Sequence, residues 1–290
     1  LLTTLTWVLI AIFSSIPIYI SDSGLSFTDS FFESMSGITT TGATVIQNLE
    51  IQSKGILIWR ALLQWLGGIG IIVMAVAVLP MLQVGGMQLF RLESSDNAEK
   101  ILPRATQLAG SLVLLYVIIT MSCALAYNIG GMGLFDSLAH ALTTISTGGY
   151  STHTDSFAYF SNSNLEYIAV LFMIVGSLPF VLYLQFVRGK ASSLFLDSQV
   201  LAFFTILLVS VLLCVLYIQN NADISSTESI RKSLFNVTSI LTGTGYVSAD
   251  YMEWGPFIVS LFFILMLIGG CAGSTSCGLM CSEYKFCISK

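Results

Sequence analysis

The sequence predicts an all-α polytopic membrane protein made of repeated helix–pore-loop–helix units. Of the 290 residues, 55% are hydrophobic and only 9% are charged, whereas soluble domains carry roughly a quarter charged residues. Apolar stretches of membrane length occur along the whole chain, and a short stretch rich in threonine and glycine recurs three times between them. The recurrence at a domain-sized spacing indicates repeated units rather than a solenoid.

Six apolar stretches are of the length expected for membrane-spanning helices. The chain shows neither the basic region nor the cleavage site of a signal peptide. It begins without a Met at Leu1, already inside the first apolar stretch, so we expect N-terminal residues to be missing. The six stretches lie at about 5–20, 57–82, 107–127, 165–187, 199–218 and 255–270.

The recurring stretch occupies residues 38–44, 145–151 and 241–247. Its copies align on a central glycine, and these glycines recur at spacings of 107 and 96 residues. A serine stands twelve residues before each glycine and is followed by a run compatible with a helix. Each copy therefore predicts a short helix that ends in a Thr/Ser/Gly segment. The glycines are Gly42, Gly149 and Gly245, and the serines are Ser30, Ser137 and Ser233.

Such a segment suits the binding of a dehydrated cation. The carboxyl end of a short helix carries partial negative charge, and the segment after it can turn carbonyl oxygens towards the ion in place of water. Three ordinary turns are the alternative, which the common setting of the copies disfavours. The candidate filter residues are Thr40, Thr41, Gly42 and Ala43, then Thr147, Gly148, Gly149 and Tyr150, and finally Gly243, Thr244, Gly245 and Tyr246.

The spans pair around these segments and divide the chain into three predicted pore repeats. Non-helical backbone at membrane depth is tolerated where it is buried in protein or lines water, and a pore meets that condition. The first repeat covers 1–85, with its short helix and filter at 27–44. The second covers 104–190, with its filter at 146–151, and the third covers 197–290, with its filter at 242–247.

Charge indicates the orientation. Basic residues favour the connections between repeats, which places these connections in the cytoplasm and the filters near the outer face. Most acidic residues fall on the predicted outer side, where they either concentrate cations at a pore mouth or simply keep that face solvated. The basic residues of the connections are Arg91, Lys100, Arg104, Arg188 and Lys190, and the outer acidic residues include Asp29, Glu33, Glu50, Asp136 and Glu166.

The small-residue stretch 269–278 follows the last span. It is too close to Gly245 to be a fourth filter, because a further repeat needs two more spans and its own short helix. We interpret it as an intramembrane gating loop below the filters, and residues 176–179 as a break that either borders the conduction path or is a structural kink. The candidate gating residues are Gly269, Gly270, Cys271, Ala272, Gly273, Ser274 and Thr275.

Other functions find no support in the sequence. Residues 67–70 contain three glycines, but they lie in an apolar span with no strand before them, which favours close helix packing over nucleotide binding. His140 and His153 have no cysteine or carboxylate at ligand spacing, and the Asn-x-Thr pattern at 236–238 falls inside the third short helix. We predict no enzyme, no cofactor, no resident metal and no nucleic-acid partner.

At the level of motifs the chain resembles the Trk/Ktr/HKT superfamily of potassium transporters, and within it the membrane subunits of bacterial Trk uptake systems. The resemblance rests on SMSGITTTGAT, WLGGIGIIV, ALTTISTGGYS, LTGTGYVSADY and IGGCAGST. It implies a potassium-channel-like fold, potassium uptake across the bacterial cytoplasmic (inner) membrane, filter roles for the three glycines and a gating role for 269–278. It also implies a homodimer in the lipid bilayer and a cytoplasmic nucleotide-binding regulatory ring of the TrkA type.

Two departures from the family pattern stand out. The family has four repeats and this chain has three. Its loop reads Ser276-Cys277-Gly278-Leu279 where the family continues with glycines and a lysine, and the tail 279–290 resembles nothing in the family. A reading-frame shift near residue 276 would explain both; a divergent C-terminus is the alternative. We therefore expect a fragment that lacks its fourth repeat, and the alternative function is a non-conducting membrane remnant or regulatory partner of intact subunits.

Overall fold

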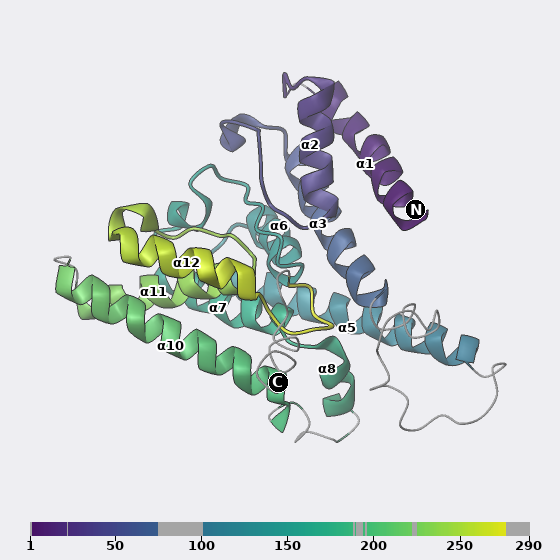
Figure 1. Ribbon diagram of the computed structural model, residues 1–290. Helices are drawn as coiled ribbons and strands as arrows, with labels where there is room; N and C mark the ends of the chain where they lie inside the picture. The colour runs from purple at the N-terminus through teal and green to yellow at the C-terminus, as the bar shows by residue number, and fades with distance from the viewer. Residues whose placement is uncertain are drawn as a thin grey trace.

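The computed structural model is entirely helical over the residues that it describes (Figure 1), which confirms the predicted fold class. The described residues form ten α-helices in a regular order, in which a long helix, a short helix and a second long or broken helix alternate. The tail 279–290 and the connection 83–100 lie outside the described residues. The structure describes residues 2–21, 23–74, 101–187, 189, 194, 196–221 and 225–276.

The helices fall into three consecutive groups (Figure 1). The first group lies at one side of the molecule in purple and the third at the other side in green and yellow, with the second group between them. The first consists of α1 (Leu2–Ile20), α2 (Phe27–Ile38) and α3 (Lys54–Val73); the second of α5 (Ile101–Ile129), α6 (Leu134–Ile145), α7 (Ser163–Ser177) and α8 (Phe180–Val187); the third of α10 (Ser198–Asn221), α11 (Ser226–Leu241) and α12 (Pro256–Ile268).

The lengths and apolar composition of these helices suit a bilayer. Three of the described helices, α3, α5 and α10, are long and apolar enough to cross a membrane, and α7 with α8 forms a fourth candidate bent by 92°. The shorter apolar helices α1 and α12 occupy the first and last predicted spans. All six predicted spans therefore contain helix, although residues 75–82 of the second span are outside the described part.

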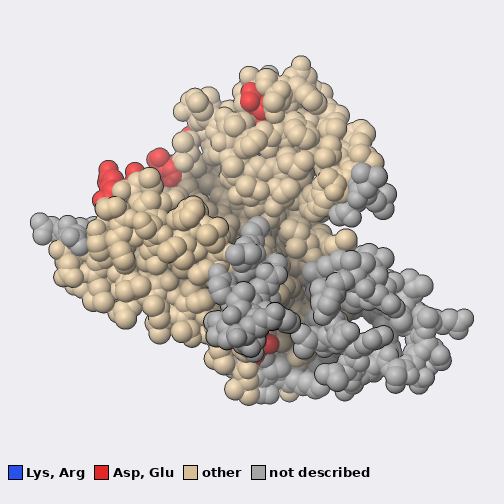
Figure 2. Space-filling model, viewed as in Figure 1, with Lys and Arg blue, Asp and Glu red and all other residues tan. Residues whose placement is uncertain are grey.

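Unlike a soluble protein, this one exposes rows of large apolar side chains. Along α5, the apolar side chains of Leu114, Ile118, Met121 and Leu125 recur every three or four residues and are each more than half exposed. Most of the described surface in Figure 2 is likewise uncharged, with acidic side chains at the top and the left of the view and again near the bottom. An apolar stripe of this size is stable against lipid tails rather than water, so the structure is that of a membrane protein.

The short helices begin and end for local reasons. Ser26 and Ser225 cap α2 and α11, because their side-chain oxygens accept the backbone N–H groups of Asp29 and Glu228 at 3.2 and 3.3 Å. None of the three short helices has a basic residue in its last turn. Their C-terminal partial negative charge is therefore not neutralised by a cation of the same helix.

The main core lies around α6. Tyr116, Tyr127, Phe157, Phe235 and Tyr246 are fully buried there and come from α5, η5 (Ser156–Tyr159), α11 and the segment after α11. Glycines in α3 allow close packing on this core. A Cβ on Gly67 would overlap the carbonyl oxygen of Ile38, and one on Gly68 would lie 2.7 Å from the Tyr116 hydroxyl. Gly67 and Gly68 thus serve close packing, whereas a Cβ on Gly70 would meet no described atom within 4 Å.

Candidate functional site: three glycine segments and the loop beneath them

The three short helices α2, α6 and α11 continue into segments of matching backbone conformation. In each segment the central glycine and the residue two positions before it have positive φ. The values are 56° and 80° for Thr40 and Gly42, 50° and 76° for Thr147 and Gly149, and 72° and 82° for Gly243 and Gly245.

The left-handed conformation is unusual for a β-branched residue and costs on the order of 1–3 kcal/mol. Thr40 and Thr147 both adopt it, and both side chains are completely buried. Backbone strain of this kind persists where the surrounding structure imposes it, and it clusters at functional sites. The two threonines therefore point to the segments as the candidate site.

The segments lie side by side in chain order. A Cβ on Gly42 would overlap the carbonyl oxygen of Gly148, and one on Gly149 would overlap that of Thr244. Among the described residues, nothing lies within 4 Å of a Cβ built on Gly245. The structure thus brings the first segment against the second and the second against the third, and no described atom meets the third segment at Gly245 in this way.

Several predicted filter carbonyls already have protein donors. The Gly148 carbonyl accepts a hydrogen bond from Gln64 Nε2 at 2.7 Å, the Ala43 carbonyl one from Ser36 Oγ at 2.6 Å, and the Tyr246 carbonyl one from Ser239 Oγ at 2.7 Å. These three oxygens are held by side chains of the scaffold. The filter role of the residues that carry them stays a prediction.

Other carbonyls of the segments remain free. Within the described part of the chain, no hydrogen bond reaches the carbonyl oxygens of Thr41, Gly42, Thr147, Gly149 and Gly245. Thr147 is buried, Gly42 and Gly149 are partly buried, and Thr41 and Gly245 are exposed. Carbonyls without a protein donor at the carboxyl ends of three helices are suited to hold a cation.

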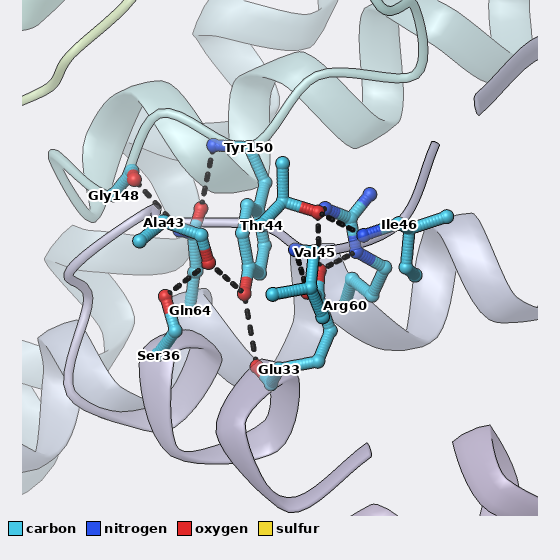
Figure 3. A network of polar contacts seen from close by, with 10 residues as sticks. All are labelled: Glu33, Ser36, Ala43, Thr44, Val45, Ile46, Arg60, Gln64, Gly148 and Tyr150. Atoms are coloured by element: carbon cyan, nitrogen blue, oxygen red, sulfur yellow. Dashed lines mark hydrogen bonds and ion pairs between the residues drawn. The ribbon is translucent and has the colours of Figure 1, made fainter. Parts of the chain in front are cut away.

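A buried ion pair lies behind the first segment (Figure 3). Glu33 of α2 and Arg60 of α3 are 0% and 1% exposed, and Arg60 Nε lies 2.7 Å from Glu33 Oε1. Glu33 also accepts hydrogen bonds from the Thr44 hydroxyl at 2.8 Å and the Val45 N–H at 2.9 Å, while Arg60 donates to the Thr44 hydroxyl at 2.9 Å. The pair therefore anchors the chain as it leaves the first segment.

The second and third repeats use neutral groups at the same position. Glu33, His140 and Asn236 each stand nine residues before the segment glycine, and all three are fully buried. His140 Nε2 lies 3.0 Å from the Ser151 hydroxyl, and Asn236 bonds both the hydroxyl and the N–H of Ser248, at 3.0 and 3.3 Å. Each side chain bonds a residue two or three positions beyond its glycine: Glu33 and Asn236 accept from a backbone N–H there, and His140 contacts a side-chain hydroxyl.

Sequence reasoning missed this layer of residues. It counted Glu33 among the outer acidic residues, but the carboxylate is buried in an ion pair. Glu166 is likewise only 7% exposed and pairs with Arg231. The available signal was Arg60 and Gln64, one helical turn apart in an apolar span, because polar groups at membrane depth seek a partner.

The break between α7 and α8 follows from Pro179. Leu178, the residue before the proline, is extended at ψ 154°, as the ring of a following proline requires. Pro179 has no N–H for the Val175 carbonyl, and the Tyr183 hydroxyl donates to that carbonyl instead at 2.8 Å.

The small-residue loop 269–276 supplies the remaining partners of this break. The N–H groups of Cys271 and Thr275 donate to the carbonyls of Ser177 and Gly176 at 3.1 and 3.3 Å, and the Phe180 N–H donates to Gly273 at 3.1 Å. The two motifs that were separate in the sequence are therefore one structural unit.

The same loop reaches the ends of two short helices. Thr275 Oγ1 lies 3.0 Å from the carbonyl of Ile145, the last residue of α6, and 3.2 Å from the Thr147 hydroxyl. Ser276 Oγ donates to the Thr242 carbonyl at 2.6 Å. The structure thus places Thr275, a candidate gating residue, and the neighbouring Ser276 against the carboxyl ends of α6 and α11. Residues 277 and 278 of the predicted loop lie outside the described residues.

The fold and this site together define a class: an all-helical membrane protein in which short helices direct their carboxyl ends and glycine segments towards one another. Comparison with known proteins gives the family. Residues 1–282 match the family described as "TrkH: Cation transport protein". The chain belongs to the TrkH family of cation transport proteins.

Curated and solved relatives agree with this assignment. The chain is 44% identical over 285 residues to the Trk system potassium uptake protein TrkI of Halomonas elongata, covering 98% of this chain and 58% of that protein. It is 38% identical over 286 residues to TrkH of Escherichia coli strain K12, covering 96% and 59%. The crystal structure of the potassium transporter TrkH from Vibrio parahaemolyticus matches with a TM-score of 0.89 and 35% identity, covering 99% of this chain and 59% of that one. The chain therefore spans less than two thirds of the length of these relatives.

Proposed function

We propose that this chain forms three of the four walls of a potassium uptake pathway across the bacterial cytoplasmic membrane. The observation that carries the proposal is the row of three neighbouring segments, each with positive φ at the same two positions and each with carbonyls free of hydrogen bonds. The relatives' names as potassium uptake proteins support potassium as the ion. Gly42, rather than a serine, at the first segment also favours potassium by resemblance to the family.

The loop 269–276 is proposed as the gate of this pathway. Its hydroxyls occupy carbonyls at the carboxyl ends of α6 and α11, where a cation leaving the segments would otherwise find negative partial charge. Movement of the loop would free those carbonyls. The proposed partners, a second copy of the chain and a cytoplasmic nucleotide-binding subunit of the TrkA type, rest on the family resemblance alone.

A non-conducting membrane partner is the second candidate. The open side of Gly245 and the exposed backbone of Thr41 and Ala43 favour it, because a ring with one side open does not enclose an ion. We therefore expect the 290 residues alone to give little potassium uptake in a host that lacks its own potassium uptake systems.

A chimera separates the two candidates. These 290 residues would replace the matched region of Escherichia coli TrkH, and potassium uptake would be measured in the same deficient host. We expect the chimera to restore uptake and the Gly149→Val chimera, in which a side chain meets the Thr244 carbonyl, to abolish it. A chimera that reaches the membrane in normal amounts and restores no potassium uptake would contradict the conducting role.

A further inference from the structure

Two tyrosines reach from one glycine segment to the short helix of the preceding repeat. Tyr150 and Tyr246 each follow a segment glycine directly, and they are 4% and 1% exposed. The Tyr150 hydroxyl donates to the carbonyl of Glu33 at 2.9 Å and also lies 3.2 Å from the Ala43 carbonyl. The Tyr246 hydroxyl lies 3.2 Å from the carbonyl of His140.

The two crossings are equivalent in register. Glu33 stands nine residues before Gly42, and His140 stands nine residues before Gly149. The tyrosine of the second segment therefore donates to the first repeat at the same place where the tyrosine of the third segment donates to the second. A single contact between two repeats would carry little weight. Because the same donor and the same acceptor position recur at two successive boundaries between repeats, the contact is a repeated feature of the fold.

Each tyrosine is held at both ends and along its ring. The backbone N–H of Tyr150 donates to Gln64 Oε1 at 3.0 Å, and the Arg60 guanidinium lies 4.0 Å above the ring centroid. The Tyr246 ring packs against Phe157 with centroids 4.6 Å apart, and its hydroxyl also contacts Thr143 and Thr144. A rigid ring fixed in this way keeps a constant length between the two walls that it joins.

We propose that Tyr150 and Tyr246 are positioning residues that set the spacing between neighbouring glycine segments, and through this spacing the size of cation that the pathway accepts. The inference rests on the proposed function. Carbonyl oxygens replace the water of an ion best at the distance that suits its radius, so wider walls favour a larger or more hydrated ion. Ala43 occupies the equivalent place in the first segment and is too short for such a crossing.

The first test asks whether the crossings hold the segments together, without any reference to transport. Tyr150→Phe and Tyr246→Phe remove only the hydroxyl; Tyr116→Phe is the matched control, because its buried hydroxyl also donates to a backbone carbonyl, that of Trp65, but joins no segments. Hydrogen exchange of the 290-residue chain in lipid nanodiscs is measured. We expect faster exchange at 40–46 in the first variant and at 143–150 in the second, and no change there in the control. Unchanged exchange at both places overturns the proposal.

The second test measures selectivity in the chimera with Escherichia coli TrkH. The ratio of potassium to sodium uptake should fall about three- to tenfold in either tyrosine variant, the range expected for one lost neutral hydrogen bond. Tyr116→Phe should keep the original ratio. An unchanged ratio in variants whose exchange has risen overturns the role in ion choice. An unmutated chimera without potassium uptake contradicts the proposed function instead, and hydrogen exchange then still decides whether the crossings exist.

Discussion

The first and third glycine segments share a backbone shape and differ in their surroundings. Gly42 and Gly245 have φ values of 80° and 82°, yet Gly42 faces the Gly148 carbonyl and Gly245 faces open space. Behind the first segment lies a buried ion pair, whereas behind the third lies the neutral amide of Asn236. The comparison teaches that the backbone path is the repeated property, while the side chains that hold it can change from charged to neutral.

The two segments should differ most in the stability lost when the side chains that anchor them, Arg60 with Glu33 and Asn236, are altered. Arg60→Met leaves Glu33 buried without its partner and should lower the free energy of unfolding by about 3–5 kcal/mol. Asn236→Ala, the matched change in the third repeat, loses neutral hydrogen bonds and should cost about 1–3 kcal/mol. Denaturant titration of the purified chain in detergent micelles measures both.

A double variant sharpens this contrast. Glu33→Gln added to Arg60→Met removes the unpaired buried charge and should recover part of the lost stability. Equal costs for Arg60→Met and Asn236→Ala, or no recovery in the double variant, would show that the ionic character of the first anchor is unimportant.

Substitution of Gly42 or Gly245 by alanine should give a smaller difference in stability between the two segments. Both substitutions place a side chain at positive φ, which costs about 1–2 kcal/mol. Gly42→Ala must also displace the Gly148 carbonyl, and overpacking of this kind adds about 1–3 kcal/mol. The melting temperature of the Gly42→Ala variant should therefore be lower than that of the Gly245→Ala variant. The reverse order would mean that the side of Gly245 is filled.

The smallest effect concerns the outer loops. The backbone N–H of Thr154 donates to Glu50 at 2.8 Å, and this hydrogen bond is the main cause that lowers the pKa of Glu50. A carboxylate with a lowered folded-state pKa stabilises the fold at neutral pH, and this contribution is lost as the pH falls below about 4.3 and through the lower folded-state value. The corresponding hydrogen bond between the second and third repeats, from the Val247 N–H to the Ser156 hydroxyl, joins two neutral groups.

Melting temperatures across this pH range test the loop contrast. The difference in melting temperature between the unmodified chain and the Glu50→Gln variant should be present at neutral pH and disappear on acidification. For the Ser156→Ala variant, the difference in melting temperature should not change with pH. A gap that widens in acid would mean that the Glu50 carboxylate is destabilising.

Much of the fold and part of the site could be predicted from the sequence. Hydropathy located the six spans, and the aligned glycines located the three segments, because both depend on local composition. The anchors could not be predicted in the same way. Glu33 and Arg60 are 27 residues apart and appear as ordinary surface charges until the two helices that carry them are packed together. Gln64 and Gly148 are joined over 84 residues, a contact that depends on the neighbouring repeat.

The predicted gate shows the same limit. Composition identified the small-residue loop and the proline break as two separate features. Their mutual hydrogen bonds could not be foreseen, because residues 176–180 and 271–275 belong to different repeats. Carbonyl direction was also beyond the sequence, since Ala43 and Tyr246 look like free filter residues until Ser36 and Ser239 are placed beside them.

The proline break also has a consequence for biosynthesis. As the ribosome delivers the chain, the carbonyls of Gly176 and Ser177 enter the bilayer about a hundred residues before Cys271 and Thr275 exist to receive them. Exposed peptide oxygens in hydrocarbon are costly, so until the last loop arrives these carbonyls need another donor, either water or the local N–H groups of Phe180 and Val181. The final hydrogen bonds of the α7–α8 break thus form only after the loop that follows α12 has been made.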